Sequence, residues 1–179
     1  MNSRGFSLEP FPPAGPPPSF RITGEAVRRA GTLAVRYALL GRLAELAIPA
    51  PAAAPARKDG LWEETCFELF LAVRGSKRYW EFNLSPAGHW NVYRFAYYRE
   101  GMEEEAAFAS LPFSAESRLD SFSLTLEVDL DKIVRADQAL EAGPGAVIKT
   151  GGGETAHWAL SHPGPRADFH RRESFTLEL

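Results

Sequence analysis

The 179-residue sequence contains a single cysteine, only two methionines and no long uncharged apolar run. Because a disulfide needs two thiols, the lone Cys66 excludes an intramolecular disulfide, and a cytoplasmic protein is the best match to this cysteine usage. The N-terminal region lacks the apolar run of a signal peptide, and prolines interrupt the longest low-charge segment, residues 44–56. We therefore expect neither a membrane-spanning segment nor a membrane partner.

The sequence also lacks a strong excess of either charge and a phosphate-binding loop. Its formal net charge is −3, which provides no broad basic surface, so we expect no nucleic-acid partner. The glycines at residues 151–153 lie between two strand-like runs, whereas a phosphate cradle joins a strand to a helix. Helical periodicity is almost absent, which disfavours a helical fold.

What the sequence has instead is a series of about eight or nine strand-like runs separated by glycine and proline. The clearest runs are residues 19–29, 31–41, 61–73, 77–85, 89–99, 121–130 and 171–179, with a hairpin at 145–162. They predict an all-β fold, a single antiparallel β-sandwich of jelly-roll type. Residues 1–18 include the segment PFPPAGPPP and are expected to form a proline-rich extended leader, which leaves residues 19–179 for the sandwich.

Strand alternation sorts the side chains of these runs, because residues two apart point to the same side of a sheet. Trp80, Phe82 and Leu84 form an apolar set that is expected in the core. The opposite side combines aromatic, acidic and amide side chains: Trp62, Glu64, Glu68, Tyr79, Glu81, Asn83, Asn91 and Tyr93. A solvated face usually carries more lysine and threonine, so a binding surface is one interpretation of this side.

Aromatic rings beside carboxylates and amides suit a sugar. The apolar C–H face of a pyranose packs on a flat ring, and its hydroxyls need paired donors and acceptors. The residues alone also fit, and slightly favour, a second interpretation, in which the rings pack beneath loops and the glutamates point to water. A slip of one residue in strand register would move the whole set to the other face.

Three segments carry a resemblance to a known family: KDGLWEETCFELFL, YWEFNLSPAGHWNVYRF and HWALSHPGPRADFHRRESFTLEL. Together they resemble the DOMON-like domains related to the family 9 carbohydrate-binding modules, over nearly the whole chain after the proline-rich leader. The resemblance implies a β-sandwich with a ligand pocket on one sheet. Relatives in this family bind sugars or haem, so the resemblance implies a small-molecule ligand, with a sugar favoured here.

The resemblance also implies roles for individual residues. In the sugar-binding relatives one tryptophan stacks on the sugar, a glutamate of the same strand binds hydroxyls, and a later tryptophan closes the other side; the matching positions are Trp62, Glu68 and Trp158. Alternation offers another place for Trp158, in the core beside Leu160, and both placements stay open. The expected site comprises Trp62, Glu64, Glu68, Glu81, Asn83, Asn91, Tyr93 and Trp158, with Arg94 as a further polar contact.

Haem and metal binding are two alternatives to a sugar. Haem needs axial ligands, and Met102 lies in an acidic segment that suits this role poorly, which leaves a pair of histidines. The residues His157, His162, Asp168 and His170 lack a tight ligand spacing. We therefore expect no metal and no cofactor, and we expect Asp168 and His170 to hold a turn through hydrogen bonds.

Catalysis and protein interaction are two further alternatives. Glu68 and Glu81 could form the carboxylate pair of a glycosidase, which would require a raised pKa in one of them. The sequence offers no reason for such a shift, so we expect a non-catalytic module. An aromatic face could also take a peptide or another protein, and the sequence leaves both this alternative and the oligomeric state open.

Overall fold

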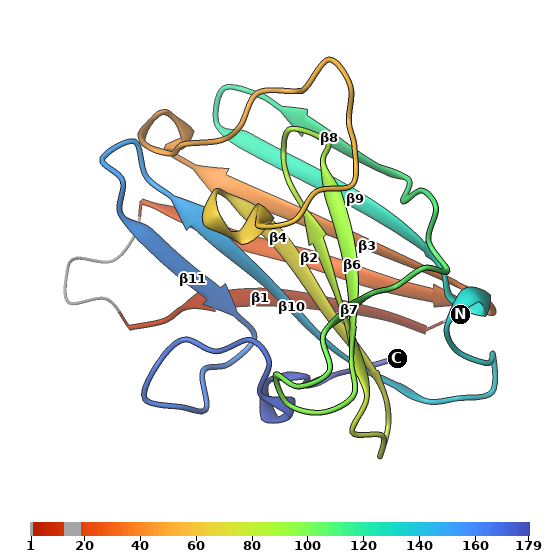
Figure 1. Cartoon of the computed structure of the whole chain (residues 1–179). Coiled ribbons are helices and arrows are strands. Elements are labelled where there is room, and N and C mark those ends of the chain that lie inside the picture. Colours follow the sequence, from red (N-terminus) through yellow and green to blue (C-terminus); the bar gives the residue numbers. More distant parts are fainter. Residues whose placement is uncertain (1, 13–18) are drawn as a thin grey trace.

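The computed structural model describes residues 2–12 and 19–179 and has two facing layers of antiparallel strands (Figure 1). The first layer contains β1 (Asn2–Pro10), β2 (Phe20–Arg29), β3 (Thr32–Gly41), β9 (Ser121–Asp129) and β8 (Phe113–Ser117), in that order. The second contains β7 (Glu103–Glu104), β6 (Trp90–Phe95), β5 (Tyr79–Leu84), β4 (Cys66–Val73), β10 (Leu140–Lys149) and β11 (Thr155–Ala159), in that order. The short β12 (Leu177–Glu178) pairs with β10. The all-β, antiparallel prediction is therefore confirmed.

Four short 3-10 turns complete the described secondary structure: η1 (Leu43–Glu45), η2 (Leu61–Glu63), η3 (Leu130–Lys132) and η4 (Arg172–Ser174). No helix among the described residues has the length and apolar character needed to cross a bilayer. Glycine and proline separate the predicted runs 77–85 and 89–99, and a turn lies there before β6, with Gly88 at φ +94° donating its amide to the carbonyl oxygen of Ser85. The predicted hairpin joins β10 to β11 through Gly153, at φ +87°.

Strand β1 connects the two layers. Most of its length pairs with β2, while Glu9 and Pro10 pair with β11, so the hydrogen-bonded path continues from one layer into the other (Figure 1). The sequence predicts that these residues belong to an extended leader that ends at residue 18. The segment Asn2–Pro10 is instead a strand of the sandwich, whereas the part of the leader at residues 13–18 lies outside the described residues.

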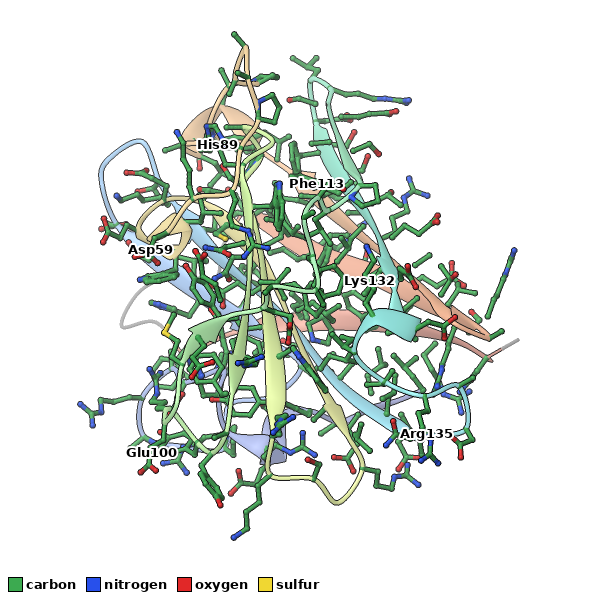
Figure 2. The ribbon with its side chains drawn as sticks, turned by 45° about the vertical axis from the view of Figure 1, so that its right-hand side comes forward. Asp59, His89, Glu100, Phe113, Lys132 and Arg135 are labelled. Carbon is green, nitrogen blue, oxygen red and sulfur yellow. The ribbon has the colours of Figure 1, made fainter. Side chains whose placement is uncertain are left out.

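The core fills the space between the layers, as the dense side chains of Figure 2 show. The Phe67 ring stacks on Phe122 with centroids 5.5 Å apart, and the Tyr37 hydroxyl donates a 2.7 Å hydrogen bond to the backbone oxygen of Glu68. Each such contact joins a residue of the first layer to one of the second. Full burial of a large apolar side chain is worth about 1.5–3 kcal/mol, so these inner faces hold the sandwich together.

Strand β4 begins later than the sequence predicts, and this changes where two expected site residues lie. The expected strand covered residues 61–73, but Gly60 has φ +69° and starts the η2 turn, so the strand begins at Cys66. Glycine adopts this left-handed conformation without strain, which explains the break in the strand. Trp62 and Glu64 therefore belong to the connection before β4, and strand alternation does not determine their directions.

Candidate functional site

The outer face of the second layer carries the polar side chains that alternation places together. Strand register aligns Glu68 of β4, Asn83 of β5 and Asn91 of β6 in one row. In the next row, Glu81 of β5 lies between Phe70 of β4 and a tyrosine of β6. Because adjacent rows on one face are two residues apart, all of these side chains leave the sheet in the same direction.

A cavity of about 330 Å³ opens on this face. Three expected site residues line it, namely Trp62, Glu68 and Glu81. The apolar part of the remaining lining comes from Phe95, Met102, Val147, Ala167 and Phe169, and the polar part from Arg99, His157, Asp168 and His170. The cavity thus combines flat rings with charged and hydrogen-bonding groups, which is the composition of small-molecule sites.

The C-terminal segment forms one wall of the cavity because glycines in β10 let it approach the sheet. A methyl group added to Gly143 would lie 2.9 Å from the Phe175 ring, and one added to Gly145 would lie 3.4 Å from the Phe169 ring. Both rings pack with Phe70 in an apolar cluster on the outer face of the sheet. The segment between them is thereby held over one half of the face, and the other half stays polar.

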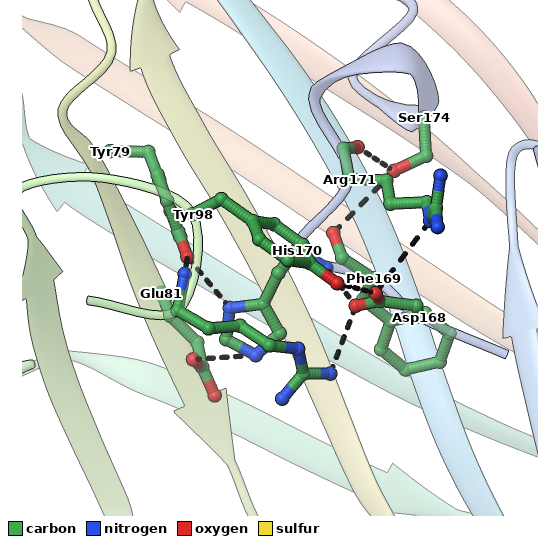
Figure 3. A network of polar contacts seen from close by, with 9 residues as sticks. Tyr79, Glu81, Tyr98, Asp168, Phe169, His170, Arg171 and Ser174 are labelled. Atoms are coloured by element: carbon green, nitrogen blue, oxygen red, sulfur yellow. Dashed lines mark hydrogen bonds and ion pairs between the residues drawn. The ribbon is translucent and has the colours of Figure 1, made fainter. Parts of the chain in front are cut away.

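His170 links this wall to the sheet (Figure 3). Its Nδ1 atom lies 2.8 Å from the Tyr79 hydroxyl, and its Nε2 atom lies 3.7 Å from Glu81 Oε2. Burial, with a smaller contribution from the positive charge of Arg99, lowers the pKa of His170 to about 4. The imidazole is therefore neutral at neutral pH, and its contact with Glu81 is a polar contact rather than an ion pair.

Asp168 joins the same wall to the turn that follows β6. Its carboxylate accepts hydrogen bonds from Arg99 Nη2 at 2.9 Å and from the Tyr98 hydroxyl. It also accepts a 3.1 Å bond from the backbone N–H of His170, so the turn expected at these two residues is confirmed. Burial opposes ionisation, but the hydrogen bonds from Tyr98 and Arg99 hold the pKa of Asp168 below its usual value. Asp168 and Arg99 thus form a charged pair at the cavity.

Arg99 adopts a backbone conformation that few non-glycine residues use, with φ +53°. Its amide donates a 3.1 Å hydrogen bond to the Tyr79 hydroxyl, which in turn contacts His170. Burial raises the pKa of Tyr79 to about 12, so the hydroxyl keeps its proton in this network. Backbone strain of this kind concentrates at functional sites, because the surrounding contacts must hold it in place.

The two glutamates on the sheet are nearly inaccessible, with 3% of Glu68 and 5% of Glu81 exposed. Burial, followed by the charge of Glu81, raises the pKa of Glu68 well above its usual value. Burial likewise raises the pKa of Glu81 to about 7, although a hydrogen bond from Asn83 lowers it. The sequence offered no reason for a raised pKa at either residue; the reason is their burial, to which His170 of the C-terminal segment contributes at Glu81.

Trp62 presents its ring to the cavity with 37% of its surface exposed. The ring packs edge-on against Tyr93, with centroids 6.0 Å apart. The Tyr93 hydroxyl donates a hydrogen bond to Asp59, which precedes η2 and is labelled in Figure 2. Tyr93 is therefore placed behind Trp62, where it supports the ring rather than lining the cavity.

Asn83 and Asn91 also lie beneath the cavity lining and are fully buried. Asn83 Nδ2 donates a 2.8 Å hydrogen bond to Glu81 Oε1, and Asn91 Nδ2 donates a 2.9 Å bond to the Tyr93 hydroxyl. Both amides thus orient side chains that are closer to the cavity. A direct ligand contact by either amide does not fit this placement.

Glu64 and Trp158 lie elsewhere, which corrects two expectations. Glu64 sits on the turn before β4 and pairs with Lys149 at 3.2 Å. Trp158 is 2% exposed and packs in the core against Phe20, with centroids 4.8 Å apart. Alternation along β11 points Trp158 inward and His157 outward, so the histidine lines the cavity in place of the tryptophan. Arg94 is likewise away from the cavity, bound to Glu103.

Sequence reasoning missed several lining residues, above all Arg99, Phe169 and the roles of Asp168 and His170 at the cavity. The segment ADFH contains an acid and a histidine, but nothing in it indicates which face of the sandwich it covers. Met102, set aside as a haem ligand because of its acidic surroundings, also lines the cavity. In the described parts of the chain, no group of three or more His, Cys, Asp or Glu side chains is arranged so that it could hold a metal ion.

Comparison with known structures identifies the fold. A structure described as a "putative carbohydrate-binding protein" from Bacteroides uniformis superposes with a TM-score of 0.72 at 15% identity, over 97% of this chain and 84% of that one. A carbohydrate-binding module of family 9 from Caldicellulosiruptor kristjanssonii, in complex with glucose, superposes with a TM-score of 0.54 at 11% identity, over 91% and 77% of the two chains. The chain therefore shares the fold of these proteins.

No family model matches the sequence, and no curated protein matches it.

Proposed function

We propose that this chain is a non-catalytic module that binds a carbohydrate in the cavity on the outer face of the second layer. The observation that carries the proposal is the joint placement of the exposed Trp62 ring and the buried carboxyls of Glu68 and Glu81 at one cavity of about 330 Å³. A pyranose could pack its C–H face on the ring while its hydroxyls reach the carboxyls.

The rest of the lining supports a polar ligand with an apolar face. Arg99 and His157 offer hydrogen-bonding groups at the cavity, while Phe95 and Phe169 offer flat apolar surfaces. The likeness of the fold agrees with the proposal, because the two similar structures are described as carbohydrate-binding, one of them in complex with glucose. We also propose that the chain is related to the DOMON-like domains, that its strands have jelly-roll connectivity, and that the protein is located in the cytoplasm.

The arrangement of the two glutamates favours binding over hydrolysis. Glu68 lies opposite Asn83, and Glu81 lies opposite Phe70, so the two acids are diagonal neighbours on one sheet face. Both carboxyls therefore approach a bound sugar from the same side, whereas a glycosidase places its two carboxyls on either side of the scissile bond. The raised pKa of Glu81 would suit a general acid, but hydrolysis also needs a second carboxyl on the other side of the scissile bond.

Haem is the second candidate, because Met102 and His157 line the same cavity. The apolar face of a porphyrin would have to pack near Glu68 and Glu81, and burying carboxyls against an apolar surface is costly. We expect the purified protein to show no Soret band. A Soret band that disappears in His157→Ala would favour haem over a sugar.

The carbohydrate proposal is tested by screening the purified protein on a glycan array and measuring the affinity of each hit by calorimetry. Trp62→Ala should weaken binding by about fivefold or more, because stacking on an aromatic ring is worth about 1–3 kcal/mol. Tyr97→Ala is the matched control, since Tyr97 is an exposed ring outside the cavity, and it should bind as the unmodified protein does. Equal binding by Trp62→Ala would contradict the proposal.

A further inference from the structure

The polar floor of the cavity presents hydrogen-bond acceptors in excess of donors. Glu68 lines the cavity with 97% of its surface buried, and no donor among residues 2–12 and 19–179 reaches its carboxyl group. Asn83, which lies beneath the lining, donates its amide nitrogen to Glu81 rather than to Glu68. An acceptor left unsatisfied in a buried position costs about 1–3 kcal/mol, so this floor favours a ligand that brings donors.

The protein also provides no cation for the two acids. Within the described residues, neither Glu68 nor Glu81 forms an ion pair with a lysine or arginine, and the one basic side chain within 4 Å of the Glu81 carboxyl is that of the neutral His170. Arg99 influences both acids at longer range, but its Nη2 atom is bound to Asp168 at 2.9 Å. Two neighbouring carboxyls without a counter-ion repel each other when both are ionised.

We propose that the sugar bound in this cavity carries a protonated amine, as a 2-amino-2-deoxy sugar does, and that its ammonium group binds between Glu68 and Glu81. This inference rests on the proposed function and adds the ligand class. An ammonium group has three donors and no acceptor, which matches the acceptor-rich floor. Its positive charge favours the ionised form of both carboxyls, so ammonium binding displaces their protons and forms two charge-assisted hydrogen bonds. The sugar ring then extends towards Trp62 at the same cavity.

A neutral sugar lacks this complementarity. A hydroxyl brings one donor and two lone pairs, so it satisfies one carboxyl while turning its own acceptor towards other acceptors. An N-acetyl group keeps the nitrogen but removes its charge and adds a carbonyl oxygen. Amino, hydroxyl and N-acetyl forms of one sugar therefore test the inference by changing a single substituent.

The experiment titrates the full chain with glucosamine, glucose and N-acetylglucosamine by calorimetry at about pH 6.5, where a primary amine is protonated. We expect glucosamine to bind at least about tenfold more tightly than either neutral sugar, because charge-assisted hydrogen bonds are about twice as strong as neutral ones. Glu68→Gln should remove the preference. Glu64→Gln should keep it, since Glu64 is a nearby acid that pairs with Lys149 outside the cavity.

The outcomes separate this inference from the proposed function. Glucose or N-acetylglucosamine binding as tightly as glucosamine would overturn the ammonium site and leave the carbohydrate proposal standing. Cyclohexylamine has a ring and an amine but no hydroxyls. If it binds as tightly as glucosamine, the hydroxyls contribute nothing to binding, and the claim that the ligand is an amino sugar is wrong. The comparison of ligands on the unmodified protein decides the matter even if Glu68→Gln does not fold.

Discussion

The guanidinium of Arg99 donates a 2.9 Å hydrogen bond to the carboxylate of Asp168, and this contact joins two segments that lie 69 residues apart in the sequence. One segment is the turn that leaves β6, and the other is the C-terminal segment that packs over the sheet. The cavity is therefore bounded by segments that belong to no regular strand, although its floor is built from β4 and β5. The shape of the site depends on this contact as well as on the sheet.

Replacing Asp168 by alanine should loosen the C-terminal wall of the cavity. The change removes the acceptor of Arg99, Tyr98 and the His170 amide. Bonds to a charged group are worth about 1.5–3 kcal/mol, and partial exposure reduces this, so we expect a loss of about 1–2 kcal/mol in the free energy of unfolding. Urea denaturation measures this loss, and hydrogen exchange should quicken at residues 167–171.

The control for this change is Asp137→Ala, which removes the carboxylate of a fully exposed pair with Arg135. It should leave the unfolding curve unchanged. If both alanine variants unfold alike, the contact between Asp168 and Arg99 does not hold the wall.

Stability should decrease as the pH rises from about 6.5 through about 7, because of the buried acids. Burial raises the pKa of Glu81 to about 7 and the pKa of Glu68 well above its usual value, whereas both titrate near 4.3 when unfolded. The folded protein thus holds more protons than the unfolded chain above about pH 4.3, so the free energy of unfolding falls with rising pH until these protons have left the folded protein.

His170 has the opposite effect over a lower pH range. Its pKa is about 4 in the folded protein against about 6.5 in the unfolded chain, so stability from this group rises with pH between those values and is constant above them. The decline above about pH 6.5 therefore reports on Glu68 and Glu81. Glu68→Gln should flatten it in urea titrations, while Glu127→Gln, at an exposed position of β9, should keep it. An unchanged slope in Glu68→Gln would refute the assignment.

The two tryptophans expected to enclose a sugar should behave differently when they are replaced. Trp158 fills the core beside Phe20, so Trp158→Ala should cost about 3–5 kcal/mol in the free energy of unfolding. Trp62 is partly exposed at the cavity, so Trp62→Ala should cost much less and should mainly weaken sugar binding. Thermal unfolding and calorimetry on both variants check the contrast. A large loss of stability in Trp62→Ala would show that its ring is a packing residue.

Strand alternation predicted the face of the sheet because the side-chain period in a strand is fixed at two residues. It placed Glu68, Glu81 and Asn83 on one side, and it also offered the core position of Trp158 that the structure shows. Residues 163–171 have no such period, and their position over the sheet depends on contacts far away in the sequence. His170 of this segment contacts Glu81, and the burial that raises the pKa values of both acids depends on the folded structure, so the local sequence carries no signal for it.

Strand β1 was missed for a related reason. The prolines at residues 10–18 indicate an extended segment that lacks backbone donors, and the predicted leader includes residues 1–9 in the same segment. The preceding residues have donors, and they pair along their length with β2. The pairing of this segment with β2 and β11, which are distant in the sequence, shows that it connects the two layers.

Gly143 should be required for the close approach of the C-terminal segment to β10. A methyl group there would lie 2.9 Å from the Phe175 ring, which is held by Phe70 and Tyr79 in the apolar cluster and has little room to move. Overpacking of this kind costs about 1–3 kcal/mol, so Gly143→Ala should reduce the free energy of unfolding by that amount and weaken ligand binding. Gly152→Ala is the control, because the nearest atom to its added methyl lies 3.7 Å away. Equal stability of the two variants would mean that the segment adjusts without cost, and the cavity wall would then be less rigid than its packing indicates.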